Sequence, residues 1–393
     1  MQPAVWHYLQ ISGALDKEFV SALSKSVPAI GWEPAMSFSA FLNNRSKGEC
    51  ERINDDPQLR IRSFPMQRGY SRPPLSWLAQ IGHRVTRRVE RQSVDPVNTP
   101  LICSTPYYAH VAEQWPGPVI YYLTDLIAAY GGADEELVHS LDRRMCSAAK
   151  LVCPNSNRLA EYLQTKASCR ADKIQVIPNA TRESNILPEP LLRPCALPDD
   201  VADLPRPVAG VIGNMAGNLN WTLLESLVEQ TPEFSWLFVG PTSMEIESES
   251  ERGARQAVLD RKGRVRFVGR KPYSSLVHYA RAIDVAVLPY MRREPTFSGS
   301  STRFYEHLAA CRPMISTKGF EELLHKQPLL RLINAADEGA KVLRELLRCQ
   351  FEDSQIQQRW LASKEGTWEV RAAAVQVALA ERLRNDFPGQ IVA

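Results

Sequence analysis

Short apolar runs and longer amphipathic stretches alternate along most of the chain. In the first half, the apolar runs cover residues 4–11, 100–106, 118–125, 150–156 and 174–180. Amphipathic stretches with helical spacing of their apolar positions cover residues 133–149 and 157–167. Near-continuous apolar strands that alternate with such helices are typical of a parallel sheet with helices on both faces. This half of the sequence therefore predicts one α/β domain.

A proline-rich segment interrupts the pattern. Residues 187–210 contain six prolines, which exclude the interior of a helix or of a central strand. After this segment the alternation restarts, with apolar runs at residues 207–214, 234–241, 264–270, 284–290 and 312–317. We predict domains at residues 1–186 and 208–350, a linker at 187–207, and a helical tail at 351–393 that could pack back on the first domain.

The predicted fold class is α/β, with two tandem, doubly wound, Rossmann-like domains. Open parallel sheets bind ligands beyond the carboxyl ends of their strands. Two such domains that face one another would form a deep cleft, so we expect a catalytic cleft between them.

Composition indicates an ordinary globular protein. The chain has 393 residues, 44% hydrophobic and 23% charged, and its net charge of +3 is too small to indicate nucleic-acid binding. No leader pattern precedes the first apolar run, and no run approaches the roughly 18 apolar residues that span a bilayer. The eight cysteines form no CxxC pair and have no histidine at zinc spacing. We therefore expect a cytoplasmic protein with no metal or other cofactor.

One predicted helix of the second half begins with hydroxyls and charges. Ser300, Ser301 and Thr302 can cap the free amides of its first turn. A helix N-terminus attracts phosphate, and Arg303 adds a two-pronged cation. Glu306, one turn along, could accept hydrogen bonds from both hydroxyls of a ribose. The pattern suggests a nucleotide site, and the alternative is an ordinary capped helix with two exposed charges.

Several segments resemble GT-B glycosyltransferases, especially the bacterial group 1-like enzymes that build surface polysaccharides. The likeness is carried by residues 211–241, 265–290 and 301–317 in the second half and by 119–132, 151–163 and 174–180 in the first. It spans residues 100–345. It implies transfer of a sugar from a nucleotide-sugar donor, bound by the second domain, to a hydroxyl of a glycan or lipid-linked saccharide.

The resemblance also implies which residues bind the donor. Gly213 and Asn214 lie in the loop that approaches the diphosphate, and Arg270, Lys271 and Tyr273 lie near the nucleotide base. Without the resemblance, the glycine could serve only a turn, and the two basic residues could be a solvated strand end.

The hydroxyl run described above and Arg303 are implied to hold the diphosphate, and Glu306 the ribose. The sequence departs from the family at Ser298, where many retaining relatives carry a further glutamate, and Glu294 is out of register with that position. The anomeric outcome therefore stays open.

An inverting transfer needs a general base that takes the proton of the acceptor hydroxyl. The apolar run at residues 118–125 delivers Asp125 to the carboxyl end of a parallel strand, and similar inverting enzymes carry an aspartate in this context. Asp125 is our first candidate and His110 the second. The alternatives are a cap of the following helix for Asp125 and a structural role for His110. No DxD-like metal pattern stands at a strand end, so we expect catalysis without a metal.

Arginine is concentrated between residues 60 and 91. Its positions there are 60, 62, 68, 72, 84, 87, 88 and 91, against a single acidic residue, Glu90. They accompany an apolar stripe formed by Trp77, Leu78, Ile81, Val85 and Val89. A basic amphipathic helix can lie on the anionic inner face of a membrane, which would suit a lipid-linked acceptor. The alternative is a solvated helix whose apolar face joins the N-terminal core.

The sequence therefore predicts a metal-independent glycosyltransferase of cell-surface polysaccharide synthesis. A sugar-nucleotide 2-epimerase shares the architecture, but it needs more acid and base groups around the sugar than the sequence offers. A non-catalytic nucleotide-binding or assembly protein is the other alternative. The sugar, the nucleotide base, the acceptor and the oligomeric state are left open.

Overall fold

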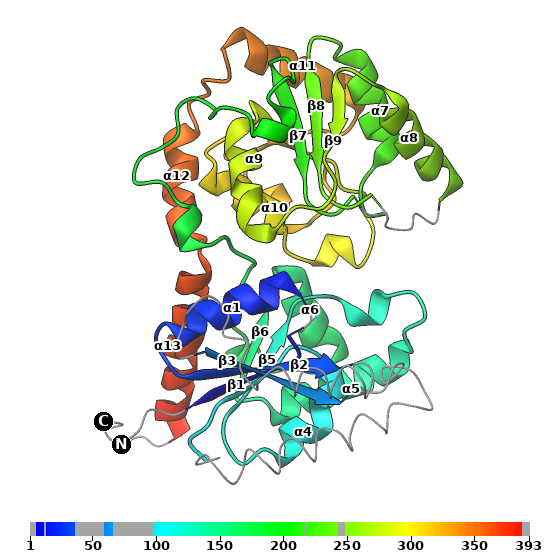
Figure 1. The fold of residues 1–393 in the computed structure, drawn as a ribbon. Helices are drawn as coiled ribbons and strands as arrows, with labels where there is room; N and C mark the ends of the chain where they lie inside the picture. The colour runs from blue at the N-terminus through cyan, green and yellow to red at the C-terminus, as the bar shows by residue number, and fades with distance from the viewer. Residues whose placement is uncertain are drawn as a thin grey trace. The chain divides into compact units, whose positions relative to one another are not determined.

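The computed structural model describes residues 5–11, 13–35, 59–65, 97–215, 217–242 and 248–386. The chain forms two compact units (Figure 1). Unit 1 comprises Met1–Pro178 and Trp368–Ala393, and unit 2 is the continuous stretch Asn179–Thr367. These limits differ from the expected ones, because the first boundary lies before the proline-rich segment and the C-terminal tail is divided between the units.

Unit 1 is built on a six-stranded parallel sheet in the order β3-β2-β1-β4-β5-β6. The strands are β1 (Trp6–Leu9), β2 (Ala29–Ala35), β3 (Leu59–Pro65), β4 (Leu101–Cys103), β5 (Val119–Leu123) and β6 (Leu151–Pro154). The order reverses between β1 and β4, where His7 pairs with Leu101. Strands β4, β5 and β6 are buried along their whole length, which fits their unbroken apolar sequences.

Helices pack around this sheet, and two of them begin at a side-chain cap. The described helices of unit 1 are α1 (Ala14–Ser24), α4 (Ala109–Gln114), α5 (Glu135–Ala148), α6 (Asn157–Lys166) and α13 (Trp368–Asp386). Asp134 accepts from the Leu137 amide at 3.0 Å and so starts α5. Ser156 accepts from the Leu159 amide at 3.0 Å and so starts α6.

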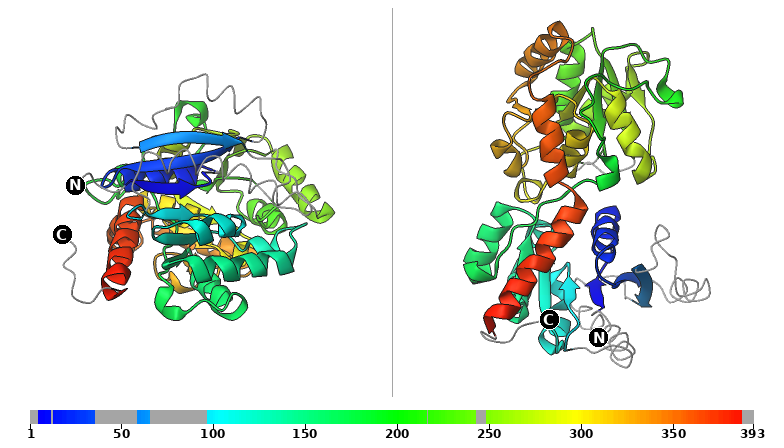
Figure 2. Two further views of the ribbon diagram at one scale, coloured as in Figure 1. Left: turned by 90° about the horizontal axis from the view of Figure 1, so that it is seen from below. Right: turned by 90° about the vertical axis from the view of Figure 1, so that its left-hand side faces the viewer.

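Helix α13 brings the end of the described chain back to unit 1, along which it runs in red in Figure 2. It packs on α1, where the Lys25 ammonium lies 2.5 Å from the Glu369 carboxylate. Trp368 is 2% exposed, and its ring meets that of Phe19 edge-on at 6.4 Å. The first part of the predicted tail, residues 351–367, belongs to unit 2.

Unit 2 repeats the architecture with a second six-stranded parallel sheet, in the order β12-β11-β10-β7-β8-β9. Its strands are β7 (Val208–Ile212), β8 (Ser235–Val239), β9 (Val265–Phe267), β10 (Val285–Leu288), β11 (Met314–Ser316) and β12 (Arg331–Leu332). The order reverses between β7 and β10, where Val285 pairs with Ala209.

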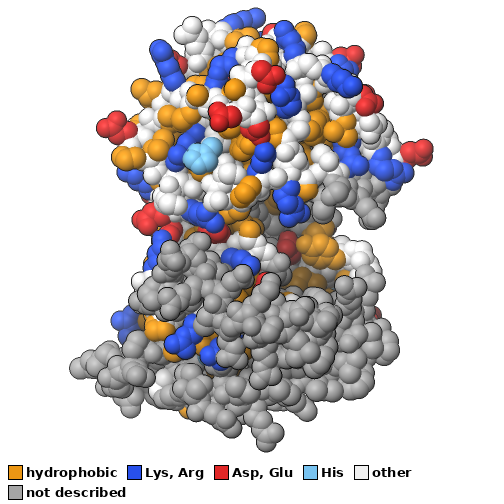
Figure 3. Space-filling model, viewed as in Figure 1, with side chains coloured by type: hydrophobic (Ala, Val, Ile, Leu, Met, Phe, Trp, Pro, Cys, Tyr) orange, Lys and Arg blue, Asp and Glu red, His pale blue; other side chains and the backbone are white. Residues whose placement is uncertain are grey.

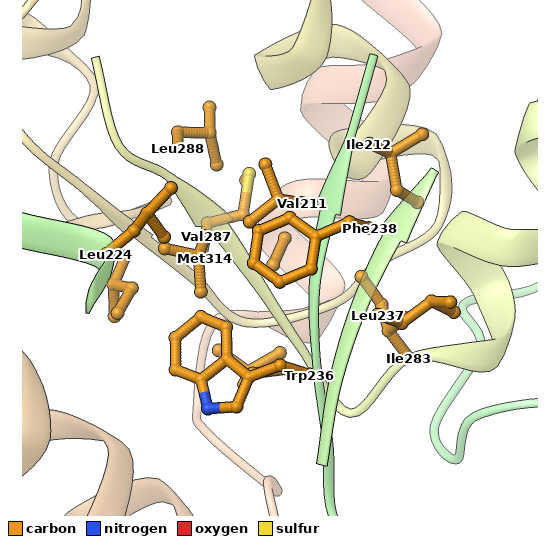
Figure 4. Close-up of a cluster of buried hydrophobic side chains, with 14 of the residues drawn as sticks. Val211, Ile212, Leu224, Trp236, Leu237, Phe238, Ile283, Val287, Leu288 and Met314 are labelled. Atoms are coloured by element: carbon orange, nitrogen blue, oxygen red, sulfur yellow. The ribbon is translucent and has the colours of Figure 1, made fainter. Parts of the chain in front are cut away.

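The core of unit 2 lies between this sheet and its helices. The described helices are α7 (Trp221–Gln230), α8 (Glu249–Asp260), α9 (Leu276–Ala282), α10 (Thr302–Ala309), α11 (Ala336–Arg348) and α12 (Ile356–Glu365). Figure 4 shows Trp236 and Phe238 of β8 beside Val211 of β7 and Leu224 of α7. All four side chains are at most 1% exposed. Their burial fixes the positions of the loops that follow the strands.

The proline-rich segment is also part of unit 2. Trp360 Nε1 donates to the carbonyl oxygen of Leu187 at 2.8 Å, and Arg206 forms an ion pair with Asp284 at 2.9 Å. Val201 is fully buried in the same core as the strands. Residues 187–207 therefore contribute to the core of unit 2.

The predicted fold class of two tandem parallel α/β domains is confirmed. In the ranges given above, no helix combines the length and apolar character that crossing a bilayer requires. On the face drawn in Figure 3, basic and acidic side chains of unit 2 are interspersed, with no large area of one sign. This distribution agrees with the small net charge of the chain.

Candidate donor site and candidate base

The reversal of strand order in unit 2 defines where a ligand would bind. Open α/β sheets bind ligands at the carboxyl ends of the two strands that flank such a reversal, here β7 and β10. The loops that follow these strands are hydrogen-bonded to each other: the Asn220 amide donates to the Pro289 oxygen at 2.7 Å, and the Met291 amide to the Asn218 oxygen at 2.8 Å. Helix α10 begins at the end of the second loop. The sequence pattern suggested this helix, and the topology places it at the reversal.

The N-terminus of α10 keeps two backbone donors available. Ser301 is its N-cap and accepts from the Phe304 amide at 3.4 Å. In the part of the chain that the structure describes, the amides of Thr302 and Arg303 donate to no protein acceptor. Free amides at a helix N-terminus, together with the helix dipole, form an anion site.

The N-terminus of α7, the helix after β7, is by contrast closed by protein groups. The Glu251 carboxylate accepts from the Trp221 amide at 2.6 Å, the Thr222 amide at 3.4 Å and the Thr222 hydroxyl at 2.6 Å. Asn220 accepts from the Leu223 amide at 2.8 Å. All three amides of the first turn are therefore occupied. Of the two helices at the reversal, only α10 is prepared to receive an anion.

Arg303 lies between α10 and the loop after β7. Its Nη2 donates to the carbonyl oxygen of Asn214, and its guanidinium lies over the Tyr290 ring, 5.2 Å from the centroid. Nη1 has no hydrogen-bond partner among the described residues. Gly213 has φ +120°, and a Cβ at that position would lie 2.5 Å from Arg303 Nε. The structure thus brings Gly213, Asn214 and Arg303 together, and the close approach explains why residue 213 is a glycine.

Glu306 is the centre of a second group of predicted residues. It is 9% exposed, and Tyr273 donates a hydrogen bond to its Oε1 at 2.6 Å. Asn185 donates to its Oε2 at 3.3 Å, and the Arg182 guanidinium lies over the Tyr273 ring at 5.0 Å. Asn185 and Arg182 could not be predicted, because both precede the proline-rich segment and belong to no recognisable pattern in the sequence.

Lys271 has a different partner. Its ammonium lies 2.6 Å from the Asp200 carboxylate, which also accepts from the Tyr279 hydroxyl at 2.8 Å. The hydrogen bond to Asp200 raises the pKa of Lys271 above its usual value. Arg270 is exposed. Lys271 is therefore held by the proline-rich segment, whereas Tyr273 joins Glu306.

The Ser300 hydroxyl forms hydrogen bonds with other groups of the protein. It is 6% exposed, donates to Glu322 Oε2 at 2.8 Å and accepts from the Asn179 amide at 3.0 Å. Thr302 Oγ1 accepts from Asn179 Nδ2 at 3.1 Å. These hydroxyls hold the turn that leads into α10, and the donors without an acceptor among the described residues are the Thr302 and Arg303 amides and Arg303 Nη1.

In unit 1, Asp125 follows β5, and the structure shows which residue caps the helix after it. Helix α5 is capped by Asp134, and the short 3-10 turn after Asp125 (Ile127–Ala129) has no side-chain cap. Asp125 is therefore not the cap of the following helix. Its backbone oxygen instead accepts from the Ile127 amide at 2.9 Å, which turns the chain at the end of the strand.

The Asp125 carboxyl has an unusual acidity. The side chain is exposed to solvent, yet desolvation by the surrounding protein raises its pKa to about 6. A hydrogen bond from Tyr130 acts in the opposite direction, and the negative charge of Asp16 adds to the rise. A carboxyl that is reachable and that titrates close to neutrality suits general base catalysis.

His110 is placed less favourably for contact with a substrate. It lies on α4 and is 8% exposed. Two of the arginines in the basic region, Arg60 and Arg62, lie on β3 at the edge of the sheet. The remaining arginines and the apolar stripe lie outside the described residues.

Comparison with known proteins identifies solved structures with a similar fold. No protein-family model matches the chain. The chain is similar to a sucrose-phosphate synthase of Thermosynechococcus elongatus, with 15% identity, a TM-score of 0.70 and coverage of 98% of this chain and 100% of that one. It is similar to HepE of Anabaena, solved in complex with UDP, with 16% identity, a TM-score of 0.65 and coverage of 96% and 100%. A glycosyltransferase of Rickettsia africae shares 12% identity, with a TM-score of 0.69 and coverage of 98% and 100%.

A curated protein is also similar in sequence. TuaH of Bacillus subtilis, named as a teichuronic acid biosynthesis glycosyltransferase, is 22% identical over 209 residues, which are 51% of this chain and 50% of TuaH. The chain thus matches about half the length of this relative. With two parallel six-stranded sheets and these structural neighbours, the chain is a protein of the GT-B fold, as the resemblance in its sequence implied.

Proposed function

We propose that this protein is a glycosyltransferase that moves a sugar from a nucleotide-sugar donor to a hydroxyl of a glycan or lipid-linked saccharide. The observation that carries the proposal is the N-terminus of α10. Two unengaged amides and an arginine with an unpartnered Nη1, among the described residues, stand at the reversal of strand order in unit 2. This set of donors matches the oxygens of a diphosphate.

The comparisons support the choice of ligand and pathway. HepE is described in complex with UDP, with UDP and glucose, and with UDP-glucose. TuaH is named for the biosynthesis of teichuronic acid. A UDP-sugar is therefore the first donor to test. None of these observations favours a 2-epimerase or a non-catalytic binding protein.

In the proposed reaction, the N-terminus of α10 binds the leaving diphosphate. As the bond to the sugar breaks, negative charge grows on the diphosphate, and the Thr302 and Arg303 amides with the guanidinium stabilise it. These groups are fixed before the reaction, so little reorganisation is needed. We propose that no metal ion takes part, and chelation with EDTA during the assay tests this point.

Glu306 is proposed to bind the ribose. Its two oxygens accept from Tyr273 and Asn185, and these contacts hold the carboxylate in place. Tyr273, Arg270 and Lys271 are proposed to lie near the nucleotide base. The ion pair of Lys271 with Asp200 leaves its aliphatic stem as the part that a base could contact.

Asp125 is proposed as the general base that takes the proton of the acceptor hydroxyl, with His110 as the second candidate. The pKa of Asp125, about 6, means that most of this carboxyl is ionised at neutral pH. The same pKa is high enough for the carboxyl to hold a proton in the transition state. A general base of this kind is the group that an inverting transfer requires.

A cytoplasmic location with peripheral contact to an anionic membrane completes the proposal. Its basis is the basic, amphipathic pattern at residues 60–91. Sedimentation with vesicles that contain phosphatidylserine tests it, and binding that salt does not weaken would contradict it.

The deciding experiment is a donor panel. UDP-, GDP- and TDP-sugars are screened by thermal shift, and those that stabilise are incubated with and without a polyprenyl-linked saccharide. A ligand at about 100 times its Kd should stabilise by roughly 2.7 kcal/mol. Release of free nucleoside diphosphate supports the enzyme. Binding without any turnover, with or without acceptor, would favour a binding protein instead.

A further inference from the structure

The Glu322 carboxylate holds the turn that leads into α10. It lies at the start of a 3-10 turn (Glu322–His325), and its side chain is only 9% exposed. Its Oε2 accepts from the Ser300 hydroxyl at 2.8 Å and from the Ser301 amide at 3.1 Å. Its Oε1 accepts from the Tyr305 hydroxyl. One carboxylate thus connects three groups that flank the N-cap of the helix.

Asn179 holds the same turn through other atoms. Its backbone amide donates to Ser300 Oγ at 3.0 Å. Its side-chain Nδ2 donates to the Ser300 carbonyl oxygen at 2.8 Å and to Thr302 Oγ1 at 3.1 Å. We call Glu322 and Asn179 the Ser300 clamp, because both bind the hydroxyl of that residue.

A carboxylate so close to an anion site requires a reason. Negative charge beside a diphosphate weakens its binding unless that charge is balanced. The charge of Glu322 is balanced by three hydrogen-bond donors and by Lys326, whose ammonium lies 3.4 Å from Oε1. The clamp also takes the Ser301 amide and leaves those of Thr302 and Arg303. It therefore determines which donors of the helix end remain for a ligand.

We propose that Glu322 and Asn179 are positioning residues for nucleoside diphosphate, which they serve by fixing the direction of the Thr302 and Arg303 amides without touching the ligand. This inference rests on the proposed function of the α10 N-terminus. Neither residue was suggested by the sequence. The clamp joins groups that lie 21 and 121 positions apart along the chain.

The test replaces the acceptor by an amide of the same shape. In Glu322→Gln, one oxygen becomes an NH₂ group, so Ser301 N–H, Tyr305 O–H and Ser300 O–H can no longer all find an acceptor. Glu321→Gln is the matched control, because Glu321 is the neighbouring residue and its carboxylate pairs with His325 at 2.8 Å, away from the turn. UDP and uridine are titrated by calorimetry against wild type and both variants.

Glu322→Gln should weaken UDP about tenfold, the effect of one lost hydrogen bond to a charged group, and leave uridine unchanged. Glu321→Gln should match wild type for both ligands. Wild-type UDP affinity in Glu322→Gln, or equal losses for UDP and uridine, would overturn the positioning role. Asn179→Asp, which removes the donor to Ser300 and Thr302 at constant shape, should act in the same direction and provides a second variant if Glu322→Gln does not fold.

Hydrogen exchange without ligand separates this inference from the proposed function. Amides at residues 300–304 should exchange faster in Glu322→Gln than in wild type, with other peptides unchanged. Unchanged exchange at these residues overturns the clamp even if UDP binds. A different result is faster exchange in Glu322→Gln together with a wild-type protein that binds no nucleoside diphosphate. That result would contradict the proposed function, and the clamp would then have no ligand to serve.

Discussion

Arg303 occupies a position that a purely structural residue would avoid. A cation in the first turn of a helix is opposed by the helix dipole, which favours negative charge there. Arg303 is nevertheless the second residue of α10, and its charge is near enough to lower the pKa of the buried His307, after the larger effect of desolvation, to about 3. This unfavourable arrangement is relieved when an anion binds, which is the expectation for a ligand site.

Arg303→Ala should therefore weaken UDP by about 10- to 100-fold, which corresponds to the roughly 1.5–3 kcal/mol of hydrogen bonds between charged groups. Uridine should bind as to wild type, because the arginine is assigned to phosphate. Arg292→Ala is the matched control, since Arg292 is exposed on the loop after β10 and packs on Phe297. Calorimetry measures both ligands, and equal losses for UDP and uridine would remove Arg303 from the diphosphate site.

Asp125→Asn should lower turnover by about 10² to 10⁴ while leaving donor affinity intact, because a positioned base acts on the acceptor proton. In wild type, kcat should rise between about pH 5 and pH 7, as a carboxyl with a pKa of about 6 ionises. Asp134→Asn is the control, because asparagine caps a helix as well as aspartate does. If Asp125→Asn transfers the sugar at a near-normal rate, Asp125 is not the general base, and His110 becomes the candidate.

Stability should respond to Asp125 in the opposite direction from activity. Its folded pKa of about 6 lies above the ordinary value of 3.8, so the folded protein binds this proton more tightly than the unfolded chain. The contribution of the group to stability therefore falls as pH rises through the interval between these values. Asp125→Asn should raise the thermal midpoint at pH 7 relative to wild type, and a lower midpoint would indicate a structural role.

At the scale of elements, the two helices beside the reversal of strand order differ in what occupies their first turn. The Glu251 carboxylate and Asn220 close α7, whereas α10 is capped and clamped so that two amides remain. Without this contrast, either helix end could be named as the phosphate site, because both follow strands at the same edge. The contrast predicts that α7 matters for stability and α10 for ligand.

Glu251→Ala should accordingly lower the free energy of unfolding by about 1–3 kcal/mol, because it leaves the buried Trp221 amide without its acceptor. UDP affinity of the folded fraction should not change. Glu249→Ala, an exposed position in the first turn of α8, should cost less than about 0.5 kcal/mol. Urea denaturation measures stability, and a loss of UDP affinity in Glu251→Ala with normal stability would reverse the roles of the two helices.

The elements themselves were predictable where apolar sequence is continuous. The run at residues 118–125 contains β5 (Val119–Leu123), and the run at 234–241 contains β8 (Ser235–Val239). Strand β2 (Ala29–Ala35) was missed because glycine and proline interrupt it. The run at 174–180 forms no full strand, but it lies along β6 through the bridge from Ile174 to Val152 and the hydrogen bond from the Ile177 amide to the Pro154 oxygen at 2.9 Å.

The candidate site was predictable only in its local part. Ser301, Arg303 and Glu306 lie within one and a half turns of a helix, so their spacing is visible in the sequence. Glu251 and Glu322 are ordinary surface-type residues until the fold brings them to helix ends 29 and 21 positions away. Contacts of this kind depend on strand order, which hydrophobic periodicity does not encode.

At the scale of the whole molecule, the chain passes from unit 1 to unit 2 after Pro178 and returns after Thr367. The two passages lie side by side within unit 2, where the Thr181 amide donates to the Gly366 oxygen at 2.9 Å and Thr181 bridges to Thr367. Unit 1 consequently depends on α13, the helix that follows the return, for part of its core.

Trp368→Ala should lower the free energy of unfolding of unit 1 by about 3–5 kcal/mol, the usual cost of removing a large buried aromatic side chain. Trp368 is 2% exposed against α1, whereas Val377 on the same helix is 57% exposed. Val377→Ala should therefore have little effect and serves as the control. Unfolding followed by hydrogen exchange separates the two units, and a loss of stability confined to unit 2 would contradict the assignment of α13 to unit 1.

The return of α13 also affects the order of events during synthesis. Translation proceeds from the N-terminus, so α1 leaves the ribosome long before the helix that covers it, and all of unit 2 is made in between. Phe19, Val20 and Leu23 of α1 are at most 1% exposed in the finished protein, and some of that apolar surface has no partner until α13 emerges. Domains generally fold as units once their sequence is complete. The half of the protein that is translated first is therefore the half that finishes folding last.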